Sequence, residues 1–196
     1  MYKFFGIVFG FFFNMKQFLL LIILIFSQQD LFSQQFYTDS GIIKFDGSKA
    51  AFEPIKATNN SSISIIDSKT GQIAAVILIN QFEFRLGLMQ EHFNENYLES
   101  NVYPKSTFEG KIKDFNVMNL NENVIIHEIT GNLTIKGVAK KIKTIAEISK
   151  LDNQIKIKSN FSVFLSDFGI KVPKIVFKKI DEEVKISLNF TYDKKQ

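Results

Sequence analysis

Apolar and polar residues alternate with a period of two along most of the chain after residue 34, and this pattern constrains the fold more than any other feature. The clearest run lies near the C-terminus, where apolar residues share one parity and polar residues the other: Val184, Ile186, Leu188, Phe190 and Tyr192 against Lys185, Ser187, Asn189 and Thr191. Because successive side chains of a strand point to opposite faces, such a run predicts a β-strand with one buried face.

Further runs of this kind predict about eight or nine strands in all. The run 155–165 repeats the pattern, and in the run 124–135 the apolar residues share their parity with His127. The remaining predicted strands span 42–45, 51–57, 63–66, 73–84, 108–117 and 142–148. Turns rich in Gly, Asn and Asp separate neighbouring runs, and such short connections favour an antiparallel meander. The predicted fold class is therefore all-β.

One segment, residues 88–100, breaks the alternation and predicts a helix. Met89, Phe93 and Tyr97 follow one another at intervals of four residues, which places them on one helical face. Polar residues occupy most of the other positions, and Pro104 follows the segment. We therefore expect one short amphipathic helix that ends before the proline. An antiparallel meander with one helix favours a barrel or a curled sheet that carries a lid.

Residues 1–33 differ from the rest of the chain and predict an export signal. Phe18–Phe26 is a run of nine apolar residues, and Lys16 precedes it directly after Met15. A short positive segment, an apolar run of this length and then small or polar residues are typical of a secretory signal peptide. We expect cleavage after Ser33, with Ser27 as the alternative site. The mature domain then spans residues 34–196 and is periplasmic or secreted.

Two further readings of the leader stay open. Met15 followed by Lys16 makes a better start than Met1, so residues 1–14 would be an upstream extension. The competing interpretation of the leader is a retained membrane anchor. A membrane span needs about 20 mostly apolar residues, and a Lys near its centre is costly, so the cleaved signal is favoured.

The composition excludes several classes of chemistry. The chain has no Cys, which rules out disulfides, thiol catalysis, thiolate zinc sites, iron–sulfur clusters and an acylated lipoprotein anchor. A formal net charge of +4 is too small to predict a nucleic-acid partner. No nucleophile-elbow or Gly-rich phosphate pattern occurs, so we expect neither enzymatic activity nor a cofactor. Glu91, His92 and Glu95 are the strongest metal candidate, but this spacing with one His favours a solvated helix face.

Two polar residues could face a ligand. His127 lies on the apolar parity of its strand, which is typical of a core histidine with a satisfied hydrogen bond or of a polar group inside a cavity. Arg85 stands where the strand from Ile73 ends and the helix approaches. It could contact an anionic head group, although a salt bridge at the rim is the commoner role for such a residue.

Three stretches, in this order along the chain, resemble the YceI-like family. Residues 97–110 (YLESNVYPKSTFEG) resemble its helix exit, Tyr-Pro and following strand, residues 131–140 (GNLTIKGVAK) its G-x-L-x-[IL]-x-G-V-x-K hairpin, and residues 161–170 (FSVFLSDFGI) its late strand. The usual H-x-x-[IV]-x-F-x-[IV]-x-H stretch near the mature N-terminus is replaced by residues 41–52. Residues 92–97 look like a shorter subgroup that we associate with Bacteroidetes-type bacteria.

The resemblance implies an eight-stranded antiparallel lipocalin-like β-barrel whose apolar cavity holds a polyisoprenoid or related amphiphilic lipid without catalysis. Its partner is then a long-chain lipid, and membrane contact comes only through the leader or during transient lipid exchange. The oligomeric state is left open, with a dimer among the options. From parity and motif position, the expected cavity residues are Phe82, Phe84, Leu88, Met89, Phe93, Tyr97, Phe108, Ile125, His127, Ile129, Leu133, Phe161, Val163 and Phe168, with Arg85 as a head-group contact.

Two alternatives remain at this point. The barrel could be a ligand-free structural or interaction module, closed by its own side chains and acting through loops such as residues 119–123. A hydrolase has the weakest support. Eight-stranded barrels either fill with side chains or hold one small ligand, so the presence of an apolar cavity discriminates between the first two readings.

Overall fold

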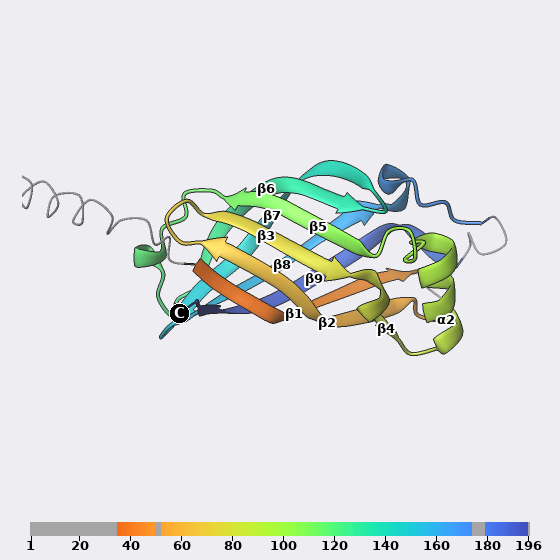
Figure 1. The fold of residues 1–196 in the computed structure, drawn as a ribbon, viewed down its shortest axis with the longest axis horizontal. Coiled ribbons are helices and arrows are strands. Elements are labelled where there is room, and N and C mark those ends of the chain that lie inside the picture. Colours follow the sequence, from red (N-terminus) through yellow and green to blue (C-terminus); the bar gives the residue numbers. More distant parts are fainter. Residues whose placement is uncertain (1–34, 50–51, 174–178, 196) are drawn as a thin grey trace, which may run out of the picture. The chain divides into compact units, whose positions relative to one another are not determined.

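The strands form one antiparallel sheet that closes on itself (Figure 1). We describe a computed structural model of the chain over residues 35–49, 52–173 and 179–195. Its strands are β1 (Gln35–Ser48), β2 (Lys56–Asp67), β3 (Gln72–Leu78), β4 (Glu83–Phe84), β5 (Lys105–Ile112), β6 (Ile125–Ile135), β7 (Val138–Leu151), β8 (Gln154–Phe164) and β9 (Ile180–Lys194).

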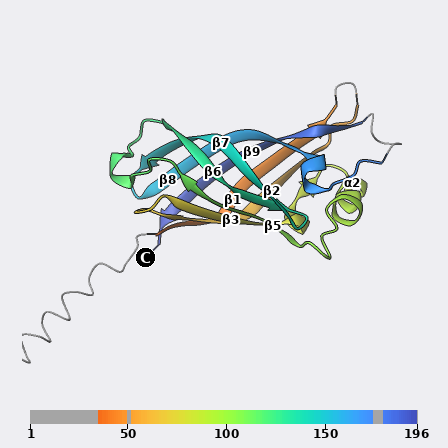
Figure 2. The same cartoon turned by 90° about the horizontal axis from the view of Figure 1, so that it is seen from above.

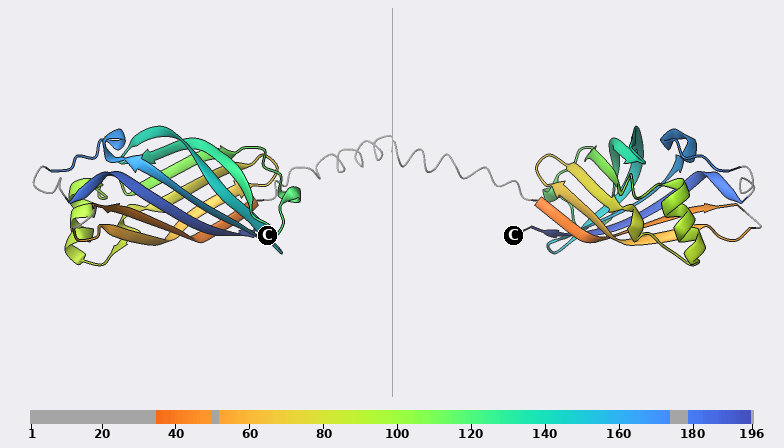
Figure 3. Two further views of the ribbon diagram at one scale, coloured as in Figure 1. Left: turned by 180° about the vertical axis from the view of Figure 1, so that it is seen from behind. Right: turned by 45° about the vertical axis from the view of Figure 1, so that its right-hand side comes forward.

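Strand pairing closes an eight-stranded barrel. The neighbour order is β1-β9-β8-β7-β6-β5-β3-β2, and β1 also pairs with β2, so neither of them forms a free edge. The two residues of β4 add to β2 outside this ring, opposite Ala57 and Thr58. In Figure 3, the view from behind shows β9 running beside β1 along the closing wall. The predicted eight-stranded antiparallel barrel is confirmed, while the predicted signal segment and its cleavage site lie outside the described residues.

The period-two pattern sorts side chains between the interior and the solvent. In β9, Val184, Phe190 and Tyr192 are buried, whereas Lys185 and Asn189 between them are exposed. The strands β6, β7 and β8 follow the same rule. Parity therefore predicts correctly which face of these strands is buried, because a barrel interior excludes the charged residues that the outer face keeps in water.

The strand β2 differs from the prediction in where it begins and in the polar residues that it buries. The prediction of a strand over 51–57 is wrong, because the described residues 52–55 are irregular and β2 begins at Lys56. The strand then runs through the polar stretch that the alternation rule reads as a break. Asn59 is fully buried there, and its amide donates to the Leu78 carbonyl at 3.0 Å while its Oδ1 accepts from the Ser62 hydroxyl at 3.1 Å. These bonds satisfy the polar groups inside the sheet.

Two other predicted strands are shorter than expected. The run 73–84 breaks after Leu78, where a 3₁₀ turn at Ile79–Gln81 precedes the short β4. The run 108–117 is β5, which begins earlier and ends at Ile112; Val117 lies in a separate 3₁₀ turn, Val117–Asn119. Asp114, in the turn between them, adopts a left-handed φ of 53°.

The predicted helix is present and lies at one end of the barrel (Figures 1 and 2). An α-helical part, α2 (Gly87–His92), continues as a π-helical turn, η2 (Phe93–Tyr97), in which Leu98 N donates to Phe93 O at 3.0 Å. Another short 3₁₀ helix, η4 (Leu165–Phe168), follows β8. The chain's C-terminal end lies at the opposite end of the barrel from α2 (Figure 1). In the described part of the chain, no helix has both the length and the apolar character to span a membrane.

Side chains fill the end of the barrel opposite the helix. Ile66, Ile112, Ile148 and Ile155 are fully buried there and pack in one cluster with Tyr192. Close packing of this kind leaves no room for a guest. A second cluster, which includes Leu98, Leu133 and Phe168, surrounds the helix end. The interior between the closed end and the helix holds the cavity described next.

Candidate functional site: an apolar barrel cavity

A cavity of about 500 Å³ occupies the barrel interior. Every strand of the barrel ring except β2 contributes to its described lining, together with α2, η2 and η4. The lining includes Leu88, which is 63% exposed, and the exposed His92, so the cavity reaches the surface beside α2. This volume lies within the range of about 300–1,000 Å³ that small-molecule sites span. The reading of a barrel filled by its own side chains is therefore not supported.

Most of the residues predicted from parity and motif position lie on this one cavity. Parity selects the inward face of each strand, and the four-residue interval selects the inward face of the helix. The structure brings together twelve of the predicted residues: Phe82, Phe84, Leu88, Met89, Phe93, Tyr97, Phe108, Ile129, Leu133, Phe161, Val163 and Phe168. That a ligand contacts them stays a prediction.

Ile125 and His127 do not line the cavity, which corrects two of the predicted positions. His127 Nδ1 lies 3.0 Å from the Lys113 carbonyl oxygen, and its ring meets the edge of Phe115 at 6.3 Å between centroids. Ile125 packs against the cluster at the closed end, which contains Phe115. Parity gives the face of a residue but not its depth along the barrel axis, and β6 begins at the filled end.

Arg85 lies between β4 and α2, outside the cavity lining. Its guanidinium forms an ion pair with Glu53, its side chain is exposed, and it is not part of the cavity lining. The salt bridge at the rim, the commoner role for such a residue, is present, and the head-group contact stays a prediction. An exposed pair of this kind contributes little to stability.

Four phenylalanines join the helix to the barrel. Phe93 of η2 contacts Phe45 of β1, Phe82 and Phe84, with ring centroids 5.0–5.6 Å apart. Phe45 also contacts Phe82 and Phe84 edge to face. All four line the cavity, so this phenylalanine cluster is both part of the wall and the contact that holds the helix in place.

Two inward-facing glycines make room for another wall residue. Gly110 of β5 and Gly131 of β6 are cross-strand partners. A Cβ atom on either would lie 2.6 Å from Phe108 Cζ and about as close to a carbonyl oxygen of the facing strand. The Phe108 ring therefore lies against bare backbone. A side chain at either glycine would displace the ring from its place in the wall.

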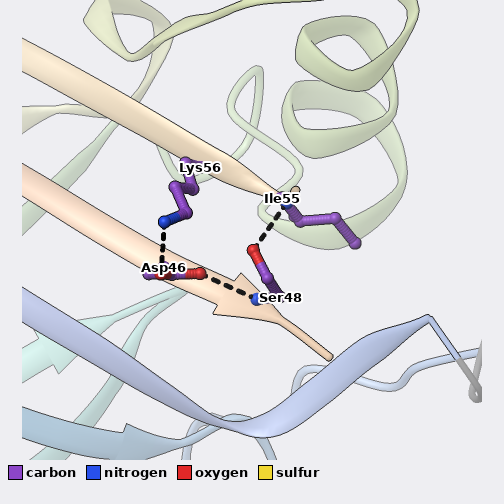
Figure 4. Close-up of polar contacts among 4 residues, drawn as sticks. All are labelled: Asp46, Ser48, Ile55 and Lys56. Atoms are coloured by element: carbon purple, nitrogen blue, oxygen red, sulfur yellow. Dashed lines mark hydrogen bonds and ion pairs between the residues drawn. The ribbon is translucent and has the colours of Figure 1, made fainter. Parts of the chain in front are cut away.

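The connection between β1 and β2 borders the mouth and is held by three polar contacts (Figure 4). Lys56 Nζ lies 2.9 Å from Asp46 Oδ2, Ser48 N donates to Asp46 Oδ1 at 3.0 Å, and Ile55 N donates to Ser48 Oγ at 2.8 Å. Partial burial works to raise the pKa of Asp46, but the bonds from Ser48 and Lys56 outweigh it and lower that pKa. These contacts position Gly47 and Ile55, which both line the cavity.

Hydroxyl groups interrupt the apolar lining at a few places. Thr144 Oγ1 lies 2.9 Å from Ser159 Oγ, which donates to the Ile145 carbonyl at 2.7 Å. The Tyr192 hydroxyl lies 2.9 Å from Ser64 Oγ at full burial, and this burial raises its pKa, while the Ser64 bond partly offsets the shift. The described lining carries no Asp or Glu. Such a surface can hold an apolar chain with a small polar group.

The ionisable groups of the described residues form no metal centre. Within residues 35–49, 52–173 and 179–195, no three His, Asp or Glu side chains lie together in a way that could hold an ion. Glu91, His92 and Glu95, the candidate set from the sequence, are all exposed on the helix.

Several lining residues were missed at the sequence level. They lie on β1, β3, β7 and β9, and the parity of their runs carried the signal: Ile43, Phe45, Ile73, Ala75, Ile77, Ile142, Val184, Ile186, Leu188 and Phe190. Gly47 and Ile55 carry no such signal, because they lie at the mouth, where the strand pattern ends.

Comparison with known proteins relates this barrel to one family. A family model described as a YceI-like domain matches residues 35–192. The comparison with curated proteins found no match. The more specific likeness to a Bacteroidetes-type subgroup stays a prediction.

Solved structures share the fold at low sequence identity. A polyisoprenoid binding domain from Saccharophagus degradans, implicated in plant cell wall breakdown, aligns with a TM-score of 0.72 at 14% identity, over 83% of this chain and 99% of that one. BcnA of Burkholderia cenocepacia aligns with 0.64 at 15%, over 77% and 95%. The Campylobacter jejuni YCEI protein aligns with 0.61 at 18%, over 76% and 90%. Likeness at this level shows the barrel fold alone.

Proposed function

Because the chain belongs to the YceI-like family, we propose that it is an exported binding protein that holds a polyisoprenoid or similar amphiphilic lipid in its barrel cavity. The observation that carries the proposal is the cavity itself, a space of about 500 Å³ lined mostly by Ile, Leu, Val and Phe. One structural neighbour is a polyisoprenoid binding domain, which supports the same ligand class.

Apolar burial supplies the affinity in this proposal. Each methylene group removed from water contributes about 0.8 kcal/mol, so a chain that reaches from the mouth towards Ile157 and Tyr192 gains in proportion to its buried length. The four-phenylalanine cluster and the helix cover the chain near the mouth. The protein carries out no chemical step on the lipid, and its contact with a membrane is transient, limited to lipid exchange.

Export is part of the proposal and rests on residues 1–33. The mature protein is expected in the periplasm or outside the cell, with Gln34 as its first residue. Fractionation followed by N-terminal sequencing tests this directly. An intact leader on protein that stays in the membrane fraction would instead favour the retained anchor.

A cavity-filling substitution tests the binding proposal. Ala75 of β3 lines the cavity, whereas Ala74 beside it lies on the opposite face of the strand. We expect Ala75→Trp to occupy the space that the lipid uses, so the thermal stabilisation given by phytol, an isoprenoid alcohol, disappears. Ala74→Trp is the matched control and keeps that stabilisation. Circular dichroism verifies that both variants retain the barrel.

Three results would contradict this account of binding. Full stabilisation of Ala75→Trp by phytol would place the lipid outside the cavity. If the smaller insertion Ala75→Leu also left binding unchanged, the cavity would have no part in binding. No stabilisation of the wild-type protein by phytol or by longer isoprenoids would contradict the proposed function itself.

A further inference from the structure

The outer surface of the barrel carries an apolar patch on β2 and β3, which run side by side along one wall (Figure 1). The outward residues of this β2–β3 patch are Ile63, Ile65, Ala74, Val76 and Leu78. Ile63 and Leu78 are 40% and 42% exposed, and the sequence has no charged residue in 58–66 or 72–82. The opposite wall differs, because β8 exposes Lys156 and Lys158 there. The cavity uses the inward residues of β3, so lipid binding does not account for the patch.

Strand register arranges the patch in three rows and places charges beside it on β5. From the closed end to the mouth, the rows are Ile65–Ala74–Glu109, Ile63–Val76–Thr107 and Leu78–Lys105. Glu109 and Lys105 therefore lie on the same edge of the patch, with the middle row halfway between them. Both side chains are exposed, and neither forms an ion pair with another described residue.

A two-fold axis along the middle row makes the patch complementary to itself. An axis that lies in the plane of the sheet, perpendicular to the strands, reverses the order of the rows and keeps each strand opposite its own copy. Leu78 of one copy then lies over Ala74 of the other, a large side chain over a small one. Lys105 lies over Glu109 of the other copy, and the axis repeats this contact, so all four charges gain a partner.

We propose that the β2–β3 patch binds a second copy of this chain, in a symmetric dimer whose two sheets pack face to face. Three strands about 4.8 Å apart and three outward rows about 6.8 Å apart span roughly 300 Å². A standard-size interface buries about 800 Å² per partner, so the dimer is weak and dissociates on dilution. Because the axis reverses the direction of the barrel, the two mouths open at opposite ends and both cavities stay accessible.

Charge reversal tests the register of the dimer. The full chain, produced with its leader and purified, is followed by sedimentation velocity from micromolar to millimolar concentrations, where the wild type should shift from monomer to dimer. Lys105→Glu should weaken dimerisation roughly tenfold, because like charges then meet twice. The double variant Lys105→Glu, Glu109→Lys exchanges the two charges and should restore the wild-type affinity. Lys158→Glu on the opposite wall is the control and should leave dimerisation unchanged.

A cross-link tests the contact at the axis. The chain has no Cys, and Val76 would face Val76 of the second copy, so a short bismaleimide should join Val76→Cys into a covalent dimer. Ser162→Cys, at an exposed outward position of β8, is the control and should stay monomeric. Circular dichroism verifies that every variant retains the barrel.

Three results would overturn the inference. The first is a wild-type monomer at every concentration, and the second is a double variant that dimerises as weakly as Lys105→Glu. The third is a monomer that floats with phosphatidylglycerol vesicles while Ile63→Lys does not, because a membrane would then occupy the patch. The patch lies outside the barrel, so in each case the thermal stabilisation by phytol is unaffected and the proposed lipid binding is tested separately.

Discussion

The hydroxyl group of Tyr192 contributes little to the stability of the barrel near neutral pH. Its ring is fully buried at the inner limit of the cavity, and its hydroxyl lies 2.9 Å from Ser64 Oγ. Ser64 also donates to the Ala74 carbonyl at 2.7 Å, so it keeps a partner when Tyr192 is changed. We therefore expect Tyr192→Phe to lower the free energy of unfolding by only about 1 kcal/mol near neutral pH, as measured by urea denaturation.

The same residue predicts a pH dependence with a definite sign. Burial raises the pKa of Tyr192 above its ordinary value of 10.0, so on raising the pH the unfolded chain loses this proton first. Its contribution is therefore complete below about pH 10 and falls above it, by up to about 1.4 kcal/mol per pH unit. The wild-type advantage over Tyr192→Phe should shrink and then reverse above that pH. A constant difference between the two proteins up to pH 11 or so would show that the hydroxyl ionises freely in the fold.

The glycines behind Phe108 give a second prediction for single residues. A Cβ atom on Gly131 would lie 2.4 Å from the Glu109 carbonyl oxygen and 2.6 Å from Phe108 Cζ, so Gly131→Ala must shift both strand and ring. We expect a loss of about 1–3 kcal/mol in the free energy of unfolding and weaker lipid binding. Gly87→Ala is the control, because a Cβ there meets nothing within 4 Å and a helical alanine is favourable. Wild-type stability of Gly131→Ala would show that the ring is not confined as described.

At the scale of elements, the helix over the mouth depends on Phe93. This side chain contacts Phe45, Phe82 and Phe84, whereas α2 has no buried residue of its own. Phe93→Ala should therefore release residues 87–97 while the barrel stays folded. We expect a local loss of about 3 kcal/mol, the lower end of the range for Phe→Ala, because Phe93 is only half-buried. Hydrogen exchange followed by mass spectrometry measures this. Glu95→Ala, at an exposed position of the same turn, is the control, and equal exchange in both variants would contradict the anchoring role.

Sequence alone predicts the elements of this fold where one face is apolar and fails where buried groups are polar. β9 follows from its alternation, and the helix follows from the interval between Met89, Phe93 and Tyr97. The run 63–66 predicts only the second half of β2, because Asn59 and Ser62 in the first half are buried in hydrogen bonds that form only once Leu78 and the neighbouring strands are in place. The local sequence pattern cannot show that residues distant in the chain will satisfy these buried polar groups with hydrogen bonds.

At the scale of the whole molecule, the sequence predicts which residues face the barrel interior but not how far along the barrel axis the cavity extends. Parity correctly turns Ile129 and Leu133 inward, yet it turns His127 inward as well, and only the filled end of the barrel places His127 away from the cavity. The empty volume itself depends on how inward side chains from opposite walls add up, including the bare backbone at Gly110 and Gly131. Neither the period-two pattern nor the family motifs predict how much volume these side chains leave empty.

The central claim, a lipid held in the barrel, is tested most directly by what the protein carries when it is purified. The full chain is produced with its leader, isolated without detergent and examined by native mass spectrometry, and the same sample is then extracted with organic solvent. We predict a complex heavier than the polypeptide and an isoprenoid or other long-chain lipid in the extract. A bare polypeptide mass, an extract free of lipid and no stabilisation by added phytol would contradict the account.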